Sequence, residues 1–160
     1  MSAAGATGAR RGAPRKKPAA ALPRLVDLPS VPSIAGDLVA IQAMTQAPFA
    51  IRRVYFVHSI PEWAVRGGHA HKRCHELVVA ASGAMTITLE SQSGLTDRYR
   101  LEDPIVGLYV PPLYWRVVEA YKPQSLCLVL ASEDYEPAEY LRDRGAFRCF
   151  DPASDADSLP

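Results

Sequence analysis

The sequence predicts an all-β domain, a sandwich or a barrel, and three observations carry this prediction. Apolar runs of about five to seven residues recur at roughly ten-residue intervals between residues 38 and 131. Glycine, proline and other turn-forming residues separate these runs. Only the segment 137–144 has the pattern of a helix, with Pro137 near its start and Gly145 after its end.

The predicted strands of the first half begin and end at turn signals. They lie around Pro29, around Pro32, and at residues 38–41, 49–60, 66–71 and 76–81. Gly36-Asp37 predicts the turn before the third strand, and Pro61 ends the fourth. The β-branched and aromatic residues of the segment 49–60 are typical of a buried strand.

The predicted strands of the second half include one with two unlike faces. They lie at residues 84–90, around 97–103, and at 105–110, 114–120 and 126–131. In the first of them Met85, Ile87 and Leu89 alternate with threonines, as in a strand with one apolar face. Ser82-Gly83 and the polar segment 91–96 predict the turns on either side of it.

Charge and composition divide the chain into three parts. Residues 1–24 hold six basic residues, no acidic one and no apolar periodicity, which predicts a disordered basic arm. The rest of the chain, which is the domain expected at 25–150 together with the tail, carries 12 basic against 17 acidic residues. It is therefore mildly acidic, which argues against a nucleic-acid-binding core. Residues 151–160 are expected to form an acidic flexible tail.

We expect a cytoplasmic protein without a membrane segment. The basic arm lacks the sustained hydrophobic region of a signal peptide, and no other segment approaches the length of a membrane span. Cys74, Cys127 and Cys149 are odd in number and have no CxxC spacing, as expected for unpaired thiols in a reducing compartment.

The stretch RGGHAHKRCHELVVAASG at residues 66–83 concentrates the side chains capable of chemistry. His69 and His71 leave the same face of a strand because they lie two residues apart. Two imidazoles directed into one space form either a metal site or an acid/base pair. The plain alternative is a pair of ordinary exposed strand histidines. Glu76 and Gly83 follow at fixed spacing.

The spacing HxH, four residues, Glu, six residues, Gly resembles the first motif of the cupin superfamily. Three blocks are similar, more specifically, to the WxcM-like sugar 3,4-ketoisomerases: RVYFVHSIPEWAVRGGHAHKRCHE, GLYVPPLYWR and LCLVLASEDYEPAEYLRDRGAF. The resemblance covers residues 36–150. It implies a cupin-like β-barrel or jelly roll with one short C-terminal helix. It also implies an isomerase that moves the keto group of a TDP-linked 4-keto-6-deoxyhexose from C4 to C3.

Arg116 bears on whether a metal is needed. It stands where metal-binding cupins supply a further histidine ligand, and a guanidinium is a permanent cation that cannot ligate. The resembled family works without metal, so we expect no cofactor. His69, His71 and Glu76 remain three candidate ligands, and a metal-dependent cupin enzyme therefore stays open as an alternative.

The resemblance implies acid/base roles for three residues. Ketone migration removes the C3 proton, passes through an enediol or enediolate, and returns a proton to C4. We expect His69 to be the principal acid/base, with His71 beside it and Tyr55 as the assisting hydroxyl; a core tyrosine is the alternative for Tyr55. Glu76 would orient an imidazole, and its charge is expected to raise the pKa of both histidines.

Substrate binding is expected to depend on arginine, because a planar guanidinium donates to two phosphate oxygens at once. Arg66 and Arg116 are the candidates for the diphosphate, with Lys72 behind them. The candidates for stacking on the nucleobase are Tyr109, Trp115 and Tyr121, between which the sequence does not choose.

A non-catalytic sugar-nucleotide-binding cupin is a further alternative. Members of the resembled family form homodimers by exchanging strands, which implies a homodimer here, with the proline-rich strands before Ile41 as candidates for exchange. His58 and His75 have no supporting pattern and are expected to be structural or surface residues.

Overall fold

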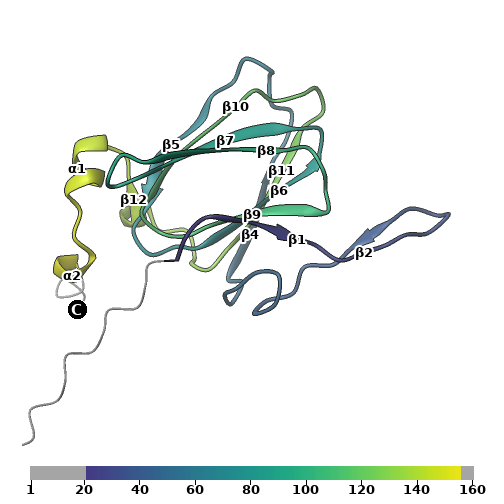
Figure 1. Cartoon of the computed structure of the whole chain (residues 1–160), viewed down its shortest axis with the longest axis horizontal. Helices are drawn as coiled ribbons and strands as arrows, with labels where there is room; N and C mark the ends of the chain where they lie inside the picture. The colour runs from purple at the N-terminus through teal and green to yellow at the C-terminus, as the bar shows by residue number, and fades with distance from the viewer. Residues whose placement is uncertain (1–20, 156–160) are drawn as a thin grey trace, which may run out of the picture.

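Two five-stranded antiparallel sheets face each other and enclose the core (Figure 1). The computed structural model describes residues 21–155 of the chain. One sheet has the strand order β1-β9-β6-β11-β4, and the other has the order β12-β5-β10-β7-β8. The prediction of an all-β fold with a short C-terminal helix is confirmed.

The first sheet consists of β1 (Arg24–Asp27), β9 (Val106–Val110), β6 (Glu76–Ser82), β11 (Leu126–Ala131) and β4 (Arg53–Val57). The second consists of β12 (Tyr140–Leu141), β5 (Arg66–His71), β10 (Tyr114–Glu119), β7 (Met85–Ser91) and β8 (Thr96–Leu101). A hairpin of β2 (Ser30–Val31) and β3 (Leu38–Val39) projects from the barrel in Figure 1. The helical segments are η1 (Pro137–Glu139), α1 (Arg144–Cys149) and α2 (Pro152–Asp155).

The main core lies between the two sheets. The predicted alternation in β7 places Met85, Ile87 and Leu89 inside, each no more than 1% exposed. They belong to one cluster with Val78 and Val129 of the opposite sheet. Burial of each such side chain contributes about 1.5–3 kcal/mol to folding, so this interface holds the sheets together.

A glycine turn joins β6 to β7, as predicted from Ser82-Gly83. Gly83 has a φ of +68°, and a Cβ at this position would lie 2.5 Å from Oγ of Ser125. That oxygen accepts a hydrogen bond from the backbone N–H of Ala84 at 3.1 Å. Only glycine therefore fits between the strands here.

β4 is shorter and less buried than the strand predicted at residues 49–60. Tyr55 and Val57 pack against the core, whereas Val54 and Phe56 are 57% and 61% exposed. β4 lies at the edge of its sheet, and among the strands of residues 21–155 it pairs with β11 alone. The prediction of a buried strand was wrong, because apolar composition does not distinguish an edge strand from a central one.

The helix predicted at residues 137–144 was wrong in position. Pro137 begins η1, which ends at Glu139, and β12 then pairs with the edge of β5 so that Tyr140 lies opposite His71. α1 begins only at Arg144, with Gly145 inside its first turn. The sheet edge therefore overrides the local helical pattern.

The predicted terminal segments lie largely outside the described residues. Arg24, which we assigned to the basic arm, is the first residue of β1, and its guanidinium lies 4.4 Å from the ring centroid of Tyr109. Residues 152–155, which we assigned to the tail, form α2. Among residues 21–155 no helix has the length and apolar character needed to cross a membrane.

Candidate active site

A glycine bulge in β5 sets the position of Arg116 on the neighbouring strand. Arg116 lies opposite His69 and Val117 lies opposite Gly67, so Gly68 is left without a partner on β10. Gly67 has a φ of +89°, and a Cβ here would lie 2.6 Å from the carbonyl oxygen of Arg116. The glycines thus permit a close approach of the two strands where the arginine enters the barrel.

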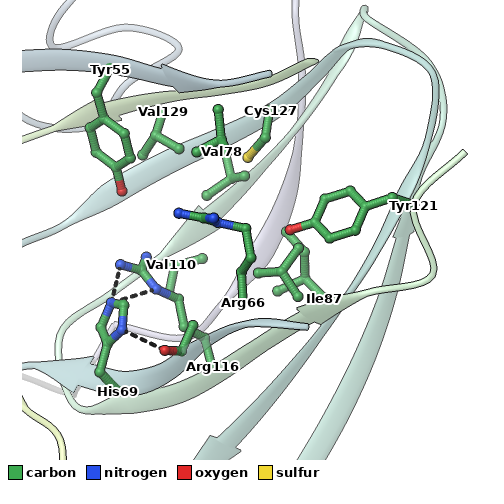
Figure 2. Close-up of a pocket in the computed structure, with 13 residues that line it drawn as sticks. Tyr55, Arg66, His69, Val78, Ile87, Val110, Arg116, Tyr121, Cys127 and Val129 are labelled. Carbon is green, nitrogen blue, oxygen red and sulfur yellow. Dashed lines mark hydrogen bonds between the residues drawn. The ribbon is translucent and has the colours of Figure 1, made fainter. Parts of the chain in front are cut away.

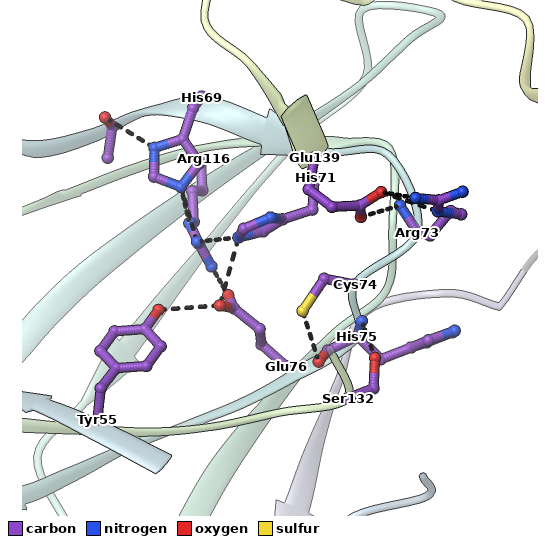
Figure 3. Close-up of polar contacts among 11 residues, drawn as sticks. Tyr55, His69, His71, Arg73, Cys74, His75, Glu76, Arg116, Ser132 and Glu139 are labelled. Carbon is purple, nitrogen blue, oxygen red and sulfur yellow. Dashed lines mark hydrogen bonds and ion pairs between the residues drawn. The ribbon is translucent and has the colours of Figure 1, made fainter. Parts of the chain in front are cut away.

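The Arg116 guanidinium binds both imidazoles of the His-Ala-His motif, which lie on one face as predicted, 5.2 Å apart between ring centroids (Figure 3). Its Nη2 lies 2.7 Å from Nε2 of His69 and 2.7 Å from Nε2 of His71. Because a guanidinium only donates, both Nε2 atoms must accept. The imidazoles are therefore neutral, with their protons on Nδ1.

The Nδ1 atoms of the two histidines differ in their surroundings. Nδ1 of His69 lies 3.1 Å from the carbonyl oxygen of Gly67, to which it donates. Nδ1 of His71 is buried and has no hydrogen-bond partner within residues 21–155. His69 is therefore oriented through both ring nitrogens, and His71 through Nε2 alone.

Glu76 lies at the start of β6, in the opposite sheet, and links the histidines to Tyr55. Its side chain is only 1% exposed and forms an ion pair with Arg116. It accepts a hydrogen bond of 2.9 Å from the hydroxyl of Tyr55 and lies 3.3 Å from Nε2 of His71. The buried carboxylate is thus compensated by a guanidinium and a phenol (Figure 3).

The electrostatics of the site hold the histidines in the neutral form. Burial, followed by the positive charge of Arg116, lowers the pKa of His69 to about 3 and that of His71 to about 3. The expectation that Glu76 raises these pKa values was wrong, because Arg116 pairs with the carboxylate and lies next to the imidazoles. Burial also raises the pKa of Tyr55, which keeps its hydroxyl protonated.

Two hollows meet at this group of side chains. An inner cavity of about 120 Å³ lies within the barrel, and six of its thirteen lining residues are valine or isoleucine (Figure 2). An outer basin of about 300 Å³ is lined by Arg53, Tyr55, His69, Arg116, Tyr135 and Tyr140. Tyr55, His69 and Arg116 line both hollows, so a ligand that spans them passes the same three side chains.

Of the predicted substrate-binding residues, Arg66 and Arg116 line the inner cavity, and Arg66 extends into it in Figure 2. Lys72 does not reach either hollow. Its Nζ lies 3.1 Å from Asp155 and 5.2 Å from the ring centroid of Phe150. The structure therefore brings together every predicted site residue except Lys72.

The three aromatic residues that we considered for nucleobase stacking are all buried. Tyr109 packs on the outer side of the first sheet and contacts Nδ1 of His75 at 2.7 Å. Trp115 packs against Phe147 of α1. Tyr121 is 4% exposed and lines the inner cavity. His75 thus has a packing role, and His58 is exposed, as expected.

Three site residues were missed from the sequence: Arg53, Tyr135 and Tyr140. Arg53 precedes Tyr55 by two residues in β4. Strand periodicity places both side chains on one face, and this signal could have identified Arg53 as a site residue. The ring centroid of Tyr140 lies 4.5 Å from that of His71 and 5.0 Å from that of His69. The helix predicted over its segment concealed this contact.

The side chains do not fit a metal ion. His69 and His71 direct Nε2 at the Arg116 guanidinium, and the carboxylate of Glu76 contacts the same group. A permanent cation therefore lies where the ligands would converge. Within the described part of the chain, no group of three or more His, Cys, Asp or Glu side chains is arranged to hold a metal.

Comparison with known proteins adds a family and close structural relatives. A family model named FdtA and described as WxcM-like, C-terminal, matches residues 22–151. A TDP-4-oxo-6-deoxy-α-D-glucose-3,4-oxoisomerase of Aneurinibacillus thermoaerophilus is 33% identical over 113 residues, which cover 71% of this chain and 81% of the relative.

Two solved structures are similar across most of the barrel. A histidine-to-asparagine variant of the 3,4-ketoisomerase QdtA of Thermoanaerobacterium thermosaccharolyticum, in complex with TDP-4-keto-6-deoxyglucose, matches with a TM-score of 0.76 and 30% identity over 79% of this chain and 91% of that one. The TDP-quinovose 3,4-ketoisomerase WlaRB of Campylobacter jejuni matches with a TM-score of 0.76 and 29% identity over 79% of this chain and 96% of that one.

Proposed function

The chain belongs to the WxcM-like family that the FdtA model describes, and on this basis we propose that it is a sugar 3,4-ketoisomerase acting on a TDP-linked 4-keto-6-deoxyhexose. The observation that carries the proposal is the convergence of a neutral imidazole, a guanidinium and a protonated phenol on one cavity. These groups are His69, Arg116 and Tyr55. They provide a base, an electrophile and a proton donor for enolisation next to a ketone.

The first half of the reaction breaks the C3–H bond. Nε2 of His69 takes the proton, and the electron pair forms a C3–C4 double bond while O4 becomes an oxyanion. Arg116 turns its N–H groups from the imidazoles to O4 and stabilises the charge. This movement also frees the lone pair of His69 and raises the basicity of Nε2. Before substrate binds, the same nitrogen accepts a hydrogen bond from Arg116 and is not available as a base.

The second half returns the proton to C4. The hydroxyl of Tyr55 gives its proton to O4 and takes one from O3, with Glu76 as its hydrogen-bond partner during the transfer. The imidazolium of His69 then protonates C4, and the carbonyl forms at C3. Atoms and electrons balance within the sugar, so the reaction needs no external oxidant or reductant.

The inner cavity is proposed to hold the hexose. Its valine and isoleucine wall suits the C6 methyl group and the carbon-bound hydrogens of a 6-deoxy sugar. Arg66, which we expected at the diphosphate, lies in this cavity and is proposed to donate to sugar oxygens instead. His71 and Glu76 position Arg116.

The test is NMR of TDP-4-keto-6-deoxyglucose with chelator-treated protein in D₂O. A 3-keto product is the expected result, with deuterium at C4 in the fraction of turnovers in which the proton on His69 exchanges with solvent before it is delivered. Absence of both product and C3 exchange would reject the isomerase, and recovery of activity only after addition of a divalent metal would favour the metal-dependent alternative. Tight binding of the sugar nucleotide without turnover would favour the non-catalytic alternative.

We further propose a cytoplasmic homodimer. The β2–β3 hairpin projects from the barrel in Figure 1. It carries exposed Val31, Ile34 and Leu38, and the edge strand β4 exposes Val54 and Phe56. Exposed apolar surface of this kind suits a second copy of the chain, with exchange of the hairpin as one arrangement. The free state of all three cysteines suits a reducing compartment. Light scattering on a sizing column measures the oligomeric state.

A further inference from the structure

The ring of Tyr140 packs against both imidazoles of the site. Its centroid lies 4.5 Å from that of His71 and 5.0 Å from that of His69, with interplanar angles of 59° and 58°. Tyr140 is half-buried and lines the outer basin, whereas His71 is 5% exposed and lines neither of the two hollows. One aromatic side chain therefore lies at the boundary between the outer basin and the imidazoles.

A buried carboxylate fixes the segment that carries this ring. Glu139 directly precedes Tyr140 and is 4% exposed. Its carboxylate accepts hydrogen bonds from the backbone N–H of Arg73 at 3.0 Å and from Nε of the same residue at 2.8 Å, and it pairs with Nη2 at 2.8 Å (Figure 3). These charge-assisted contacts compensate the burial of the carboxylate.

The same segment is tied to β5 through the backbone. The carbonyl oxygen of Glu139 accepts a hydrogen bond of 2.9 Å from the N–H of Lys72, and Tyr140 lies opposite His71 where β12 pairs with β5. Lys72 and Arg73 directly follow His71 in the chain. Glu139 therefore connects the segment of Tyr140 to the end of the strand that carries both histidines.

The buried Nδ1 of His71 indicates what the ring does. This nitrogen carries the proton of a neutral imidazole, because Nε2 accepts from Arg116. It is buried without a hydrogen-bond partner within residues 21–155. Such a proton is protected from exchange with water by packing alone, and the ring of Tyr140 packs on this imidazole.

The proposed reaction gives this packing a chemical use. His69 must keep the proton that it takes from C3 until it delivers the proton to C4. Nδ1 of His69 donates to the carbonyl oxygen of Gly67, so the transferred proton is on Nε2. A water molecule that reaches this imidazolium N–H can exchange the proton, and exclusion of water from a closed site prevents that loss.

We propose that Tyr140 shields His69 and His71 from water, so that the proton removed from C3 is the one returned to C4, and that Glu139 positions the ring through its contacts with Arg73. The inference rests on the proposed function, because it concerns a proton transfer by His69. The aromatic ring provides the shield, and the hydroxyl of Tyr140 is not required for it.

The experiment follows deuterium within the sugar. TDP-4-keto-6-deoxyglucose that carries deuterium at C3 is converted in H₂O by the full-length protein, and NMR measures the deuterium at C4 of the product. Some of the deuterium should move from C3 to C4 in the original protein. Tyr140→Ala should lower the transferred fraction by about threefold or more, whereas Tyr140→Phe, which keeps the ring, should stay within about twofold of the original. The fraction is counted per molecule of product, so loss of substrate affinity or of folded protein alone does not change it.

The positioning role of Glu139 is tested in the same assay. Glu139→Gln removes the charge from the contacts with Arg73 and should lower the transferred fraction, as Tyr140→Ala does. Glu136→Gln is the matched control, because it removes the same charge from an exposed side chain that accepts from the N–H of Ala138 at 3.3 Å. A lower Tm in Glu139→Gln with an unchanged transferred fraction would show a structural role and reject the positioning.

A second measurement needs no substrate. NMR of the ¹⁵N-labelled, unliganded protein measures how fast the Nδ1 proton of His71 exchanges with water. Exchange should be about tenfold faster in Tyr140→Ala than in the original protein, and Tyr140→Phe should resemble the original. Circular dichroism verifies the fold of each variant, and Tyr140→Leu replaces the alanine variant if that one does not fold.

The outcomes distinguish the inference from the proposed function. The shield is rejected if the original protein transfers no deuterium from C3 to C4, or if the alanine and phenylalanine variants of Tyr140 give equal results in either measurement. Isomerisation together with one of these results would retain the function. Faster exchange of the His71 proton in Tyr140→Ala alone, without isomerisation by the original protein, would retain the shield and reject the function.

Discussion

Nη2 of Arg116 lies 2.7 Å from Nε2 of His69, so a guanidinium is hydrogen-bonded to the lone pair of the nitrogen that the proposed reaction needs as a base. The interaction keeps the imidazole neutral and holds it in one tautomer, because the arginine can only donate. It also means that binding of the substrate must compete for Arg116 before the lone pair becomes available. In the unliganded site Arg116 therefore blocks the lone pair of His69 until the substrate displaces it.

Replacement of Arg116 by glutamine should raise the pKa of His69. The wild-type value is about 3, and burial and the guanidinium are its two largest causes. Without the guanidinium the value should move towards the ordinary value of about 6.5, and the protonated fraction at pH 5 should rise. NMR titration of the imidazole measures this directly. Arg66→Gln is the control, since Arg66 lines the same cavity without bonding to His69; equal titration curves for the two variants would contradict the assignment.

Stability should fall as the pH is lowered from about 6.5 towards 3. His69 and His71 have folded-state pKa values of about 3, below the ordinary 6.5 of an unfolded chain. Between these values the unfolded state binds more protons than the folded state, so acid favours unfolding. Thermal melting at several pH values checks this. In His71→Asn one such group is removed, and the Tm should depend less steeply on pH than in the original protein. An unchanged slope would rule out His71 as a source of acid sensitivity.

The local part of the site could be predicted from the sequence, because strand periodicity fixes which side chains share a face. His69 and His71 needed no information beyond their spacing. The position of Arg116 beside them required the pairing of β10 with β5 and the bulge at Gly68. Register between strands that are more than forty residues apart is a property of the packed barrel. The sequence placed Arg116 at the position of a histidine ligand of metal-binding cupins without indicating that it binds both imidazoles.

The errors in the predicted fold have the same origin. The segment that contains Tyr140 has a helical composition, but the exposed edge of β5 offers it a strand partner. Likewise, the apolar residues Val54 and Phe56 suggested burial, although no other element of the described chain covers that face of β4. Both errors arise from tertiary contacts, since the local sequence does not show which elements pack against a segment. The first of them also concealed the aromatic wall of the outer basin.

His69→Asn should abolish isomerisation while folding and TDP affinity remain close to those of the original protein. The amide can occupy the place of the ring but cannot accept a proton from carbon at neutral pH. His58→Asn is the control, because His58 is exposed and lies outside both hollows. The measurement is NMR detection of the 3-keto product together with calorimetry. Near-normal turnover in His69→Asn would remove this residue from the mechanism.

Gly67→Ala should disturb the site through the backbone. A Cβ at Gly67 would lie 2.6 Å from the carbonyl oxygen of Arg116, whereas Gly68 also has a positive φ but has no atom within 4 Å of such a Cβ. Both substitutions incur backbone strain of about 1–3 kcal/mol, but only Gly67→Ala displaces β10. Gly68→Ala is thus a matched control for strain alone. We expect Gly67→Ala to give the larger loss of stability in urea unfolding and, in addition, a raised pKa of His69, since Arg116 moves away from the imidazole. Equal effects of the two substitutions would show that the close approach of β5 and β10 does not position Arg116.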